Sequence, residues 1–230
     1  MLFRQLFDQT SHTYTYLLAE RRGGEALLID PVLENITQYV RLLEELDVQL
    51  VMAVDTHIHA DHVTALGALH EQTGCASAMG AMTGAECVSV HFHEGEKLCV
   101  DNLHLEILYT PGHTDDSYSF LLPDRVFTGD TLLIRGTGRT DFQNGDPGVQ
   151  YDSLFSKLLT LPEDTLVYPA HDYNGMTVST IGEEKRHNPR LQVADKQAYI
   201  DLMNGLVLDD PKLMDIAVPA NRACGMRSAA

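Results

Sequence analysis

Short apolar runs separated by polar turns dominate the first part of the chain. Each run is rich in aliphatic and aromatic residues, and the segments between the runs hold Gly, Asp and Ser, so we expect strands. The first three strands are predicted at residues 2–7, 13–18 and 25–30. Residues 34–46 differ, because their apolar side chains recur every three or four positions and predict an amphipathic helix with Asn35 as its N-cap.

Strands and helices alternate along the rest of the chain. An unbroken apolar run at residues 50–54 is typical of a strand buried on both faces, and a helix is expected at 63–73. Further strands are predicted at 97–100, 103–109, 117–122, 125–128 and 165–168, helices at 151–161 and 193–206, and an irregular end after them. The pattern favours an α/β (α+β) fold with two packed sheets and outer helices, in a single domain over residues 1–230 that ends in a short helical extension.

The polar segment Thr56-His57-Ile58-His59-Ala60-Asp61-His62 directly follows the buried strand at 50–54. In an extended loop, residues two apart point to the same side, so His57, His59 and Asp61 can converge. His62 lies at the expected start of the next helix. Three imidazoles and a carboxylate are unfavourable in an apolar core, because each needs a polar partner once it is buried. The segment therefore predicts a metal site, and a solvated histidine-rich loop is the simpler alternative.

Three later candidate ligands also stand at the ends of predicted strands. A proline–glycine turn after one strand presents His113, another strand ends at Asp130, and His171 follows a third. Taken alone, Asp130 could cap a turn, and either histidine could be a core residue with a polar partner. Because the same arrangement of strand and ligand occurs four times, a shared metal site is the better interpretation.

Composition and charge limit the possible partners. Of the 230 residues, 44% are hydrophobic and 21% are charged, as in ordinary globular enzymes. The net charge of −17 argues against nucleic acid and anionic membrane surfaces as partners. The sequence has neither a run of about 20 apolar residues nor the regions of a signal peptide. The four cysteines form no C-x-x-C pair, so we expect reduced thiols in a cytoplasmic protein: Cys75, Cys87, Cys99 and Cys224.

The candidate ligands together resemble the ligand set of the metallo-β-lactamase fold superfamily. The matching residues are His57-x-His59-x-Asp61-His62, His113, Asp130 and His171. This resemblance implies an αββα four-layer sandwich with its metals at one edge. It implies the architecture only, because many different chemistries use the same fold.

Further motifs resemble one family of that superfamily, the persulfide dioxygenases. They are the segments 11–18, 138–143, 169–173 and 219–221, with Cys224-Gly225. Glyoxalase II, which also acts on glutathione conjugates, usually has a longer helical tail, whereas little more than one helix is expected after His171. The resemblance therefore favours the dioxygenase.

The resemblance to persulfide dioxygenases implies one ferrous iron per chain, bound by His57, His113 and Asp130. Two imidazoles and a carboxylate leave coordination positions for a substrate and O₂. In a binuclear hydrolase, more of the set would bind metal and Asp130 would bridge the two ions. In the iron enzyme, four residues would instead orient the ligands and bind water around a vacant second metal site: His59, Asp61, His62 and His171.

The implied reaction converts glutathione persulfide, O₂ and water to glutathione and sulfite. On so acidic a chain, the anionic tripeptide needs local basic groups, and arginine can bind a carboxylate through two hydrogen bonds. The predicted substrate-binding residues are Arg139, Tyr173 and Arg190. Tyr173 corresponds, by the resemblance, to a tyrosine that contacts glutathione in the related hydrolase. The alternatives are an ion pair between Arg139 and Asp141 and a solvated charged segment around Arg190.

Two other functions are compatible with the same residues. A glyoxalase II-like binuclear hydroxyacylglutathione hydrolase would use them to bind two metal ions. A non-enzymatic metal-binding or interaction protein is the third interpretation, and it is disfavoured because no ligand of the set is missing. The family resemblance also implies a homodimer.

Overall fold

The computed structural model describes residues 1–208 and 213–226. These residues form two compact units. The first unit holds residues 1–105 and the C-terminal residues 213–226, and the second holds residues 106–208. The chain thus leaves the first unit once and returns to it near the C-terminus. The single domain expected over residues 1–230 stays a prediction.

The first six strands form one sheet in the order β1-β2-β3-β4-β5-β6. They are β1 (Leu2–Phe7), β2 (Tyr14–Ala19), β3 (Glu25–Ile29), β4 (Gln49–Val54), β5 (Ala76–Gly80) and β6 (Val90–Phe92). β1, β2 and β3 are antiparallel neighbours, whereas β3 to β6 run parallel. Parallel neighbours need crossover connections. The helix α1 (Ile36–Leu46) connects β3 to β4, and α2 (Leu66–Thr73) connects β4 to β5. The connection from β5 to β6 contains only a short 3-10 helix, Ala81–Thr83.

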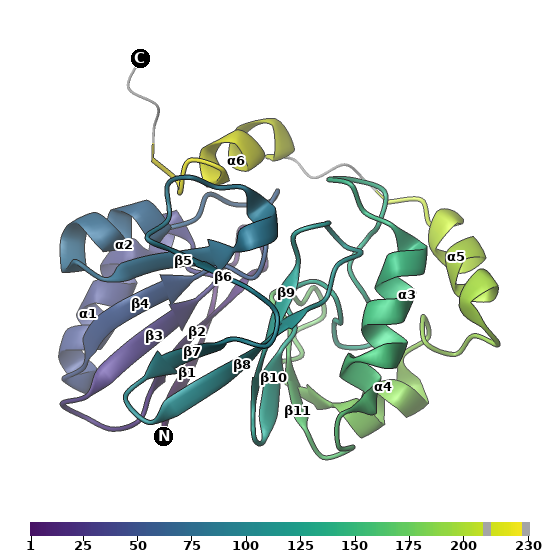
Figure 1. The fold of residues 1–230 in the computed structure, drawn as a ribbon, viewed down its shortest axis with the longest axis horizontal. Helices are drawn as coiled ribbons and strands as arrows, with labels where there is room; N and C mark the ends of the chain where they lie inside the picture. The colour runs from purple at the N-terminus through teal and green to yellow at the C-terminus, as the bar shows by residue number, and fades with distance from the viewer. Residues whose placement is uncertain (209–212, 227–230) are drawn as a thin grey trace. The chain divides into compact units, whose positions relative to one another are not determined.

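Both helices share one apolar core with this sheet, and Figure 1 shows α1 and α2 beside its strands. The apolar stripe predicted for residues 34–46 is the buried face of α1, where Tyr39 and Leu43 belong to the same core as Leu28 of β3. Asn35 occupies the N-cap position, but its side chain donates to Asp8 Oδ1 at 3.1 Å and does not cap the helix. Residues 56–62, called the metal loop below, follow the carboxyl end of the parallel strand β4, and ligand sites of α/β proteins usually lie at such ends.

The remaining strands form a second sheet in the order β12-β11-β10-β9-β8-β7. They are β7 (Lys97–Val100), β8 (Leu103–Tyr109), β9 (Tyr118–Leu122), β10 (Arg125–Phe127), β11 (Leu166–Tyr168) and β12 (Ser179–Thr180). β8, β9 and β10 are antiparallel neighbours, and β10 pairs parallel with β11. Three helices complete this part, α3 (Pro147–Ser156), α4 (Ile181–His187) and α5 (Lys196–Asn204).

A second apolar core joins these helices to β10 and β11. Leu154 of α3 and Tyr199 of α5 are fully buried in it with Val126 and Val167 of the strands. In Figure 1, α3, α4 and α5 gather on the same side of β10 and β11. β10 and β11 are therefore held from one face by packed helices while their carboxyl ends carry Asp130 and His171.

Each predicted strand is present within one residue of its expected bounds, but three short strands are not predicted. β5 has the sequence Ala-Ser-Ala-Met-Gly, whose small residues give little apolar signal. The helix expected from residue 63 begins only at Leu66, because Thr64 instead forms a bridge with Val32. The helix expected at 151–161 begins at Pro147, where Asp146 caps it, and ends at Ser156.

The prediction of an irregular C-terminal end is wrong, because α6 (Met214–Asn221) is a helix. The expectation of little more than one helix after His171 is wrong for the same reason, since α4, α5 and α6 all follow it. Pro219 lies inside α6. Because proline usually ends a helix, the sequence pattern does not predict one here. Among the described helices, none has both the length and the apolar character required to cross a membrane.

The prediction of four reduced thiols is also wrong, because Cys87 and Cys224 form a disulfide. Cys75, which is buried, and Cys99, which is exposed, are free thiols. The bridge joins residues 137 positions apart, so the absence of a C-x-x-C motif says nothing about it. The cytoplasmic location stays a prediction.

Candidate metal centre

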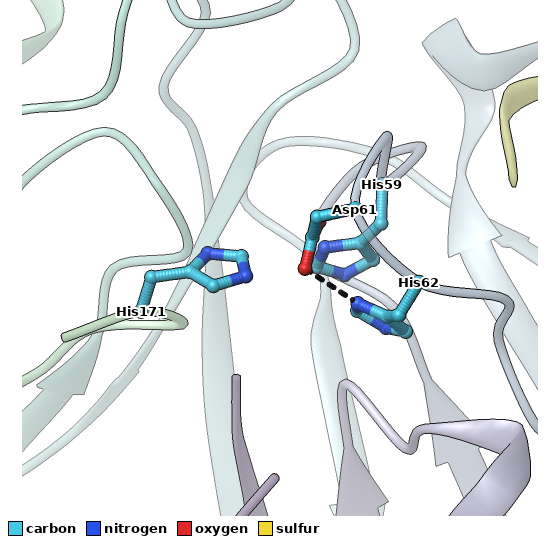
Figure 2. Close-up of side chains that lie close together, drawn as sticks. All are labelled: His59, Asp61, His62 and His171. Atoms are coloured by element: carbon cyan, nitrogen blue, oxygen red, sulfur yellow. Dashed lines mark hydrogen bonds and ion pairs between the residues drawn. The ribbon is translucent and has the colours of Figure 1, made fainter. Parts of the chain in front are cut away.

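The segment from His57 to His62 follows β4 and forms neither helix nor strand. His57, His59 and His62 are almost fully buried, and Asp61 is partly exposed. Ligand atoms of His59, Asp61 and His62 lie within 4.8 Å of one another. Figure 2 shows these three side chains side by side on the loop. The ring centres of His57 and His59 are 4.1 Å apart. The loop thus gathers three imidazoles and a carboxylate, as its spacing predicts.

Asp30, directly after β3, fixes the tautomer of His57 through Thr56. The Thr56 hydroxyl donates to Asp30 Oδ2 at 3.1 Å, and the Thr56 backbone N–H donates to Asp30 Oδ1 at 2.7 Å. Because the single hydroxyl proton goes to the carboxylate, Thr56 Oγ1 accepts from His57 Nδ1, 3.0 Å away. His57 therefore carries its proton on Nδ1 and presents the lone pair of Nε2 to a metal.

Asp30 also orients His59, whose Nε2 lies 3.2 Å from Asp30 Oδ1. Burial raises the pKa of Asp30 to about 6, against the opposing effects of His57 and of the hydrogen bonds from Thr56. Asp30 is therefore a carboxylate at neutral pH and accepts a hydrogen bond from Nε2–H of His59. The other ring nitrogen of His59, Nδ1, is then the one that can bind a cation.

Asp55 lies beside this network. It is buried, and Asp30, Asp55 and His59 offer ligand atoms within 4.8 Å of one another. Burial, followed by the nearby charge of Asp30, raises the pKa of Asp55 well above its usual range.

Asp61 and His62 are held by contacts with each other and with Thr13. Asp61 Oδ2 lies 3.0 Å from His62 Nδ1, the contact dashed in Figure 2, and accepts a hydrogen bond from the Thr13 hydroxyl at 3.1 Å. Thr13 directly precedes β2 and is fully buried. The pairing puts the proton of His62 on Nδ1, so Nε2 is the nitrogen that can bind a metal or a water molecule.

In the second unit, His113 follows β8 after a proline–glycine turn. Its Nδ1 lies 2.7 Å from the carbonyl oxygen of Arg139. Because a carbonyl oxygen can only accept, Nδ1 carries the proton and Nε2 has the lone pair. That Nε2 lies 3.5 Å from Oδ2 of Asp130. An imidazole nitrogen and a carboxylate oxygen of this unit therefore lie close enough to bind one ion.

The two oxygens of Asp130 have different neighbours. Oδ2 faces His113, whereas Oδ1 accepts from Nδ1 of His171 at 2.7 Å. His171 follows β11 and is buried. The backbone N–H of Ala170 donates to the carbonyl of Gly129 at 2.9 Å, which ties the ends of β10 and β11 together. His171 therefore orients the carboxylate that faces His113.

The chain after Asp130 folds back so that Gly138 supports the main chain of Asp130. The backbone N–H of Gly138 donates to the Asp130 carbonyl at 2.8 Å, and the Gly138 carbonyl accepts from Gln150 Nε2 at 3.1 Å. Gln150 lies fully buried on α3, and the hydroxyl of Tyr199 on α5 donates to its Oε1 at 2.7 Å. The placement of Asp130 thus depends on side chains from two helices.

Each unit therefore offers donors that suit a divalent transition metal. Imidazole nitrogens and carboxylate oxygens bind zinc and non-haem iron in proteins, and such ligands usually have a hydrogen-bonded partner that fixes their orientation. The histidines have such partners here in Thr56, Asp30, Asp61, the Arg139 carbonyl and Asp130. The donor set fits a metal centre by its chemistry and by its fixed tautomers.

Comparison with known proteins identifies the family. Residues 9–96 and 88–171 match the model of the metallo-beta-lactamase superfamily. The persulfide dioxygenases ETHE1 of Mus musculus and Homo sapiens, both called mitochondrial, are 46% and 45% identical over 99% of this chain and 90% of their own length. The chain belongs to the persulfide dioxygenase family. Its predicted metallo-β-lactamase fold is confirmed by the crystal structure of ETHE1 from Myxococcus xanthus, which is 54% identical with a TM-score of 0.96 and covers 98% of this chain and 100% of that one.

A relative with a hydrolase name is more distant from this persulfide dioxygenase family member. The probable hydroxyacylglutathione hydrolase of Schizosaccharomyces pombe is 30% identical over 90% of this chain and 91% of its own length. The relatives of this chain thus carry the names of both enzyme classes that the sequence suggests, and the identity is higher to the dioxygenases.

Arg139, a predicted substrate-binding residue, is paired within the second unit. Its Nε and Nη2 donate to the carboxylate of Asp141 at 2.7 and 2.9 Å, and its guanidinium lies 4.3 Å from the ring centre of Phe142. The alternative ion pair expected from the sequence is therefore present. Its hydrogen bond holds the pKa of Asp141 below the usual range.

Arg190 and Tyr173 differ in exposure. Arg190 is half-buried, and its Nη1 donates to the carbonyl and hydroxyl oxygens of Thr137 at 2.5 and 3.2 Å. Burial lowers the pKa of Arg190. Tyr173 is 63% exposed, with its ring parallel to that of His171 at 6.2 Å. Arg190 thus supports the segment that includes Gly138, and Tyr173 presents an aromatic surface to solvent.

Several supporting residues are absent from the sequence-based prediction. Asp30 follows a buried strand just as Asp130 does, so the same signal could have found it. Thr56 and Asn221 lie in motifs that the sequence analysis names, but their supporting roles, like that of Gln150, depend on partners that only the folded chain brings to them.

Proposed function

We propose that this protein is a persulfide dioxygenase that converts glutathione persulfide, O₂ and water to glutathione and sulfite. The balance is GSSH + O₂ + H₂O → GSH + H₂SO₃. The observation that carries the proposal is the identity of 45–46% to named persulfide dioxygenases over 99% of the chain. At that identity and coverage, the whole chain, and not only the ligand loop, resembles these enzymes.

The metal in this proposal is one ferrous ion per chain, bound by His57, His113 and Asp130. A ferrous ion on two imidazoles and one carboxylate supplies redox chemistry and coordination positions for O₂ and the persulfide sulfur. The chain fixes the tautomers of the two histidine ligands. Thr56 keeps the proton of His57 on Nδ1, and the Arg139 carbonyl does the same for His113, so that each Nε2 can bind the metal. His171 holds the carboxylate of Asp130 in one orientation.

Four other residues would surround the iron site without binding the ion in this proposal. Three of them are histidines engaged with carboxylates, at 3.2 Å to Asp30, 3.0 Å to Asp61 and 2.7 Å to Asp130. Such contacts fix the rings and leave the opposite ring nitrogens to bind water near the substrate. The four residues are His59, Asp61, His62 and His171.

Tyr173, Arg139 and Arg190 are the proposed substrate-binding residues. The exposed ring of Tyr173 supports a direct contact with glutathione. A chain with a net charge of −17 repels an anionic tripeptide, so an arginine is needed to bind its carboxylates. In this proposal, Arg139 would bind a substrate carboxylate beside its partner Asp141, and Arg190 would share the guanidinium that binds Thr137.

The remaining features of the proposal concern the assembly and location of the enzyme. We propose a homodimer in the cytoplasm, with glutathione persulfide and O₂ as partners and without nucleic acid or membrane partners. The net charge of −17 supports the last point, because nucleic acids and anionic lipid surfaces repel such a chain.

A binuclear hydroxyacylglutathione hydrolase is the second candidate. The observation that favours it is the set of His59, Asp61 and His62 on one loop, whose ligand atoms lie within 4.8 Å of one another. The 30% identity to a probable hydroxyacylglutathione hydrolase also supports it. The dioxygenase is preferred because the identity to that class is higher.

Two assays and a metal analysis distinguish the candidates. Protein purified anaerobically is analysed for iron and zinc, then assayed for O₂ uptake with glutathione persulfide and for cleavage of S-lactoylglutathione. About one iron per chain with O₂ uptake is the expected result. About two metal ions per chain with rapid thioester cleavage and no O₂ uptake would establish the hydrolase instead.

Two histidine variants sharpen this test. If one ion is bound by His57, His113 and Asp130, His113→Ala should lose the metal, whereas His62→Ala should keep about one ion per chain. In a binuclear enzyme, both variants would lose metal. His187→Ala, at an exposed histidine of α4, is the control and should match the wild type in metal content and in O₂ uptake.

A further inference from the structure

Asn221, the last residue of α6, is fully buried and binds the backbone of the metal loop. Its Nδ2 donates to the carbonyl oxygen of His59 at 2.9 Å and to that of His62 at 2.8 Å. Its Oδ1 accepts the backbone N–H of Thr64 at 2.8 Å. Both amide protons and the amide oxygen are therefore used within one short stretch of backbone.

This stretch has no helix or strand that could satisfy the same groups. Residues 57–63 lie outside regular secondary structure, and buried backbone groups need hydrogen-bond partners. One side chain from a segment more than 150 residues away supplies three of these bonds. Asn221 therefore does for the loop what a neighbouring strand does within a sheet.

The proposed ligand His57 lies between two fixed points. On one side, Asp30 binds the backbone and hydroxyl of Thr56, the residue before it. On the other, Asn221 binds the carbonyl of His59, two residues after it. With both ends fixed, the backbone of His57 has little freedom to move its ring relative to the rest of the loop.

The residues after Asn221 are fastened to the same region. The carbonyl of Cys224 accepts the backbone N–H of Gly67 at 2.9 Å, and the disulfide to Cys87 holds Cys224 from the other side. Gly225 has a φ of +73°, and a Cβ there would lie only 2.0 Å from the carbonyl oxygen of Thr64. Residues 221–225 therefore contact the metal loop and its neighbours at several points.

We propose that Asn221 is a positioning residue of the metal centre, which sets the backbone of the metal loop without touching the metal. The inference rests on the proposed function only in that it requires this loop to bind a metal. It assigns to the C-terminal helix a part in metal binding, although no residue of that helix belongs to the ligand set.

A substitution that changes one heavy atom of the Asn221 side chain tests the proposal. Asn221→Asp keeps the shape and the acceptor for Thr64 but replaces the donor nitrogen by oxygen. Two carbonyl oxygens would then face a carboxyl oxygen, and both donated bonds cannot be kept. The matched control is Asn204→Asp, the same change at an exposed residue that ends α5.

The primary measurement is Co²⁺ binding to the metal-free protein, followed by visible absorption at a temperature where circular dichroism shows every variant to be folded. Asn221→Asp should bind Co²⁺ at least about ten-fold more weakly, with altered absorption bands, as when a ligand loses its orienting contact. Asn204→Asp should match the wild type. A folded Asn221→Asp variant with wild-type affinity and spectrum would overturn the proposal and reduce Asn221 to a structural residue.

A second measurement needs no variant and applies if Asn221→Asp does not fold. The amide proton of Thr64 should exchange slowly in the wild type, and more slowly once Co²⁺ is bound, because the metal and the Asn221 contact stabilise the same loop. Protection that is absent, or equal with and without Co²⁺, would overturn the proposal. Failure of the proposed function is distinguishable, since a wild type that binds Co²⁺ but consumes no O₂ in its iron form affects only that function.

Discussion

The carbonyl oxygen of Arg139 accepts the Nδ1 proton of His113 at 2.7 Å, and the residue before Arg139 makes this approach possible. A Cβ at Gly138 would lie 2.1 Å from the carbonyl oxygen of Asp130 and 2.8 Å from His113 Nδ1. His113 and Asp130 are therefore held by one short segment, residues 138–139, and this segment has no room for a side chain at Gly138.

Gly138→Ala should consequently weaken metal binding. The added methyl group must push the peptide away from both His113 and Asp130, at a cost of about 1–3 kcal/mol in the free energy of unfolding. We expect metal affinity to fall about ten-fold or more, measured by chelator competition. The matched control is Gly136→Ala in the same segment, where a Cβ would meet nothing closer than 3.9 Å and should change neither quantity. Equal metal affinity in the two variants would contradict the role of the Gly138 peptide.

The contact of Thr56 with His57 leads to a second prediction. Thr56→Val keeps the volume of the side chain but removes the hydroxyl that accepts from Nδ1 of His57 and donates to Asp30. Without this partner the ring can rotate or change tautomer, so metal affinity should fall about 10–100-fold. Thr56→Ser retains the hydroxyl and should bind metal nearly as tightly as the wild type. If the serine variant loses as much affinity as the valine variant, packing and not the hydrogen bond controls His57.

Tyr199, which supports Gln150, should make the protein sensitive to alkali. Burial raises the pKa of Tyr199 to about 12 from an unfolded value of 10.0. Between these values the unfolded chain loses a proton that the folded protein keeps, so stability falls as pH rises above 10, by up to about 3 kcal/mol at pH 12. Thermal unfolding from pH 8 to 11.5 should show this fall in the wild type and in Tyr173→Phe, an exposed tyrosine, and a smaller fall in Tyr199→Phe. Parallel curves for all three proteins would contradict the prediction.

The elements that carry the ligands could be predicted from the sequence, because their signals are local. The runs before His57, His113, Asp130 and His171 are short and apolar, and each is a strand within one residue of its expected bounds. The polar residue that ends each run is visible in the same window. Family resemblance then assigned the superfamily, and the sequence match to persulfide dioxygenases supports that assignment.

The contacts that orient the ligands could not be predicted in the same way, because they join distant segments. Gln150 and Tyr199 come from two helices whose apolar faces reveal burial but not a hydrogen bond to the segment at Gly138. The helix that ends at Asn221 contains Pro219, which argues against a helix in any local pattern. A long-range partner leaves no periodic trace in the sequence, so only the folded chain reveals it.

The disulfide between Cys87 and Cys224 carries the last prediction, which concerns stability. A bridge that closes a loop of 137 residues restricts the unfolded chain and can contribute about 5 kcal/mol by loop entropy. The double variant Cys87→Ser/Cys224→Ser should therefore unfold at a temperature about 10–20 °C lower, since each kcal/mol shifts the midpoint by about 2–4 °C in a chain of this size. Treatment of the wild type with a reductant should lower its midpoint toward that of the double variant, whereas the double variant should not respond. Cys99→Ser, at an exposed free thiol, is the control and should behave as the wild type does in both conditions. A wild-type midpoint that is the same with and without reductant, together with two free-thiol equivalents more than Cys75 and Cys99 provide, would show that the bridge does not form in solution.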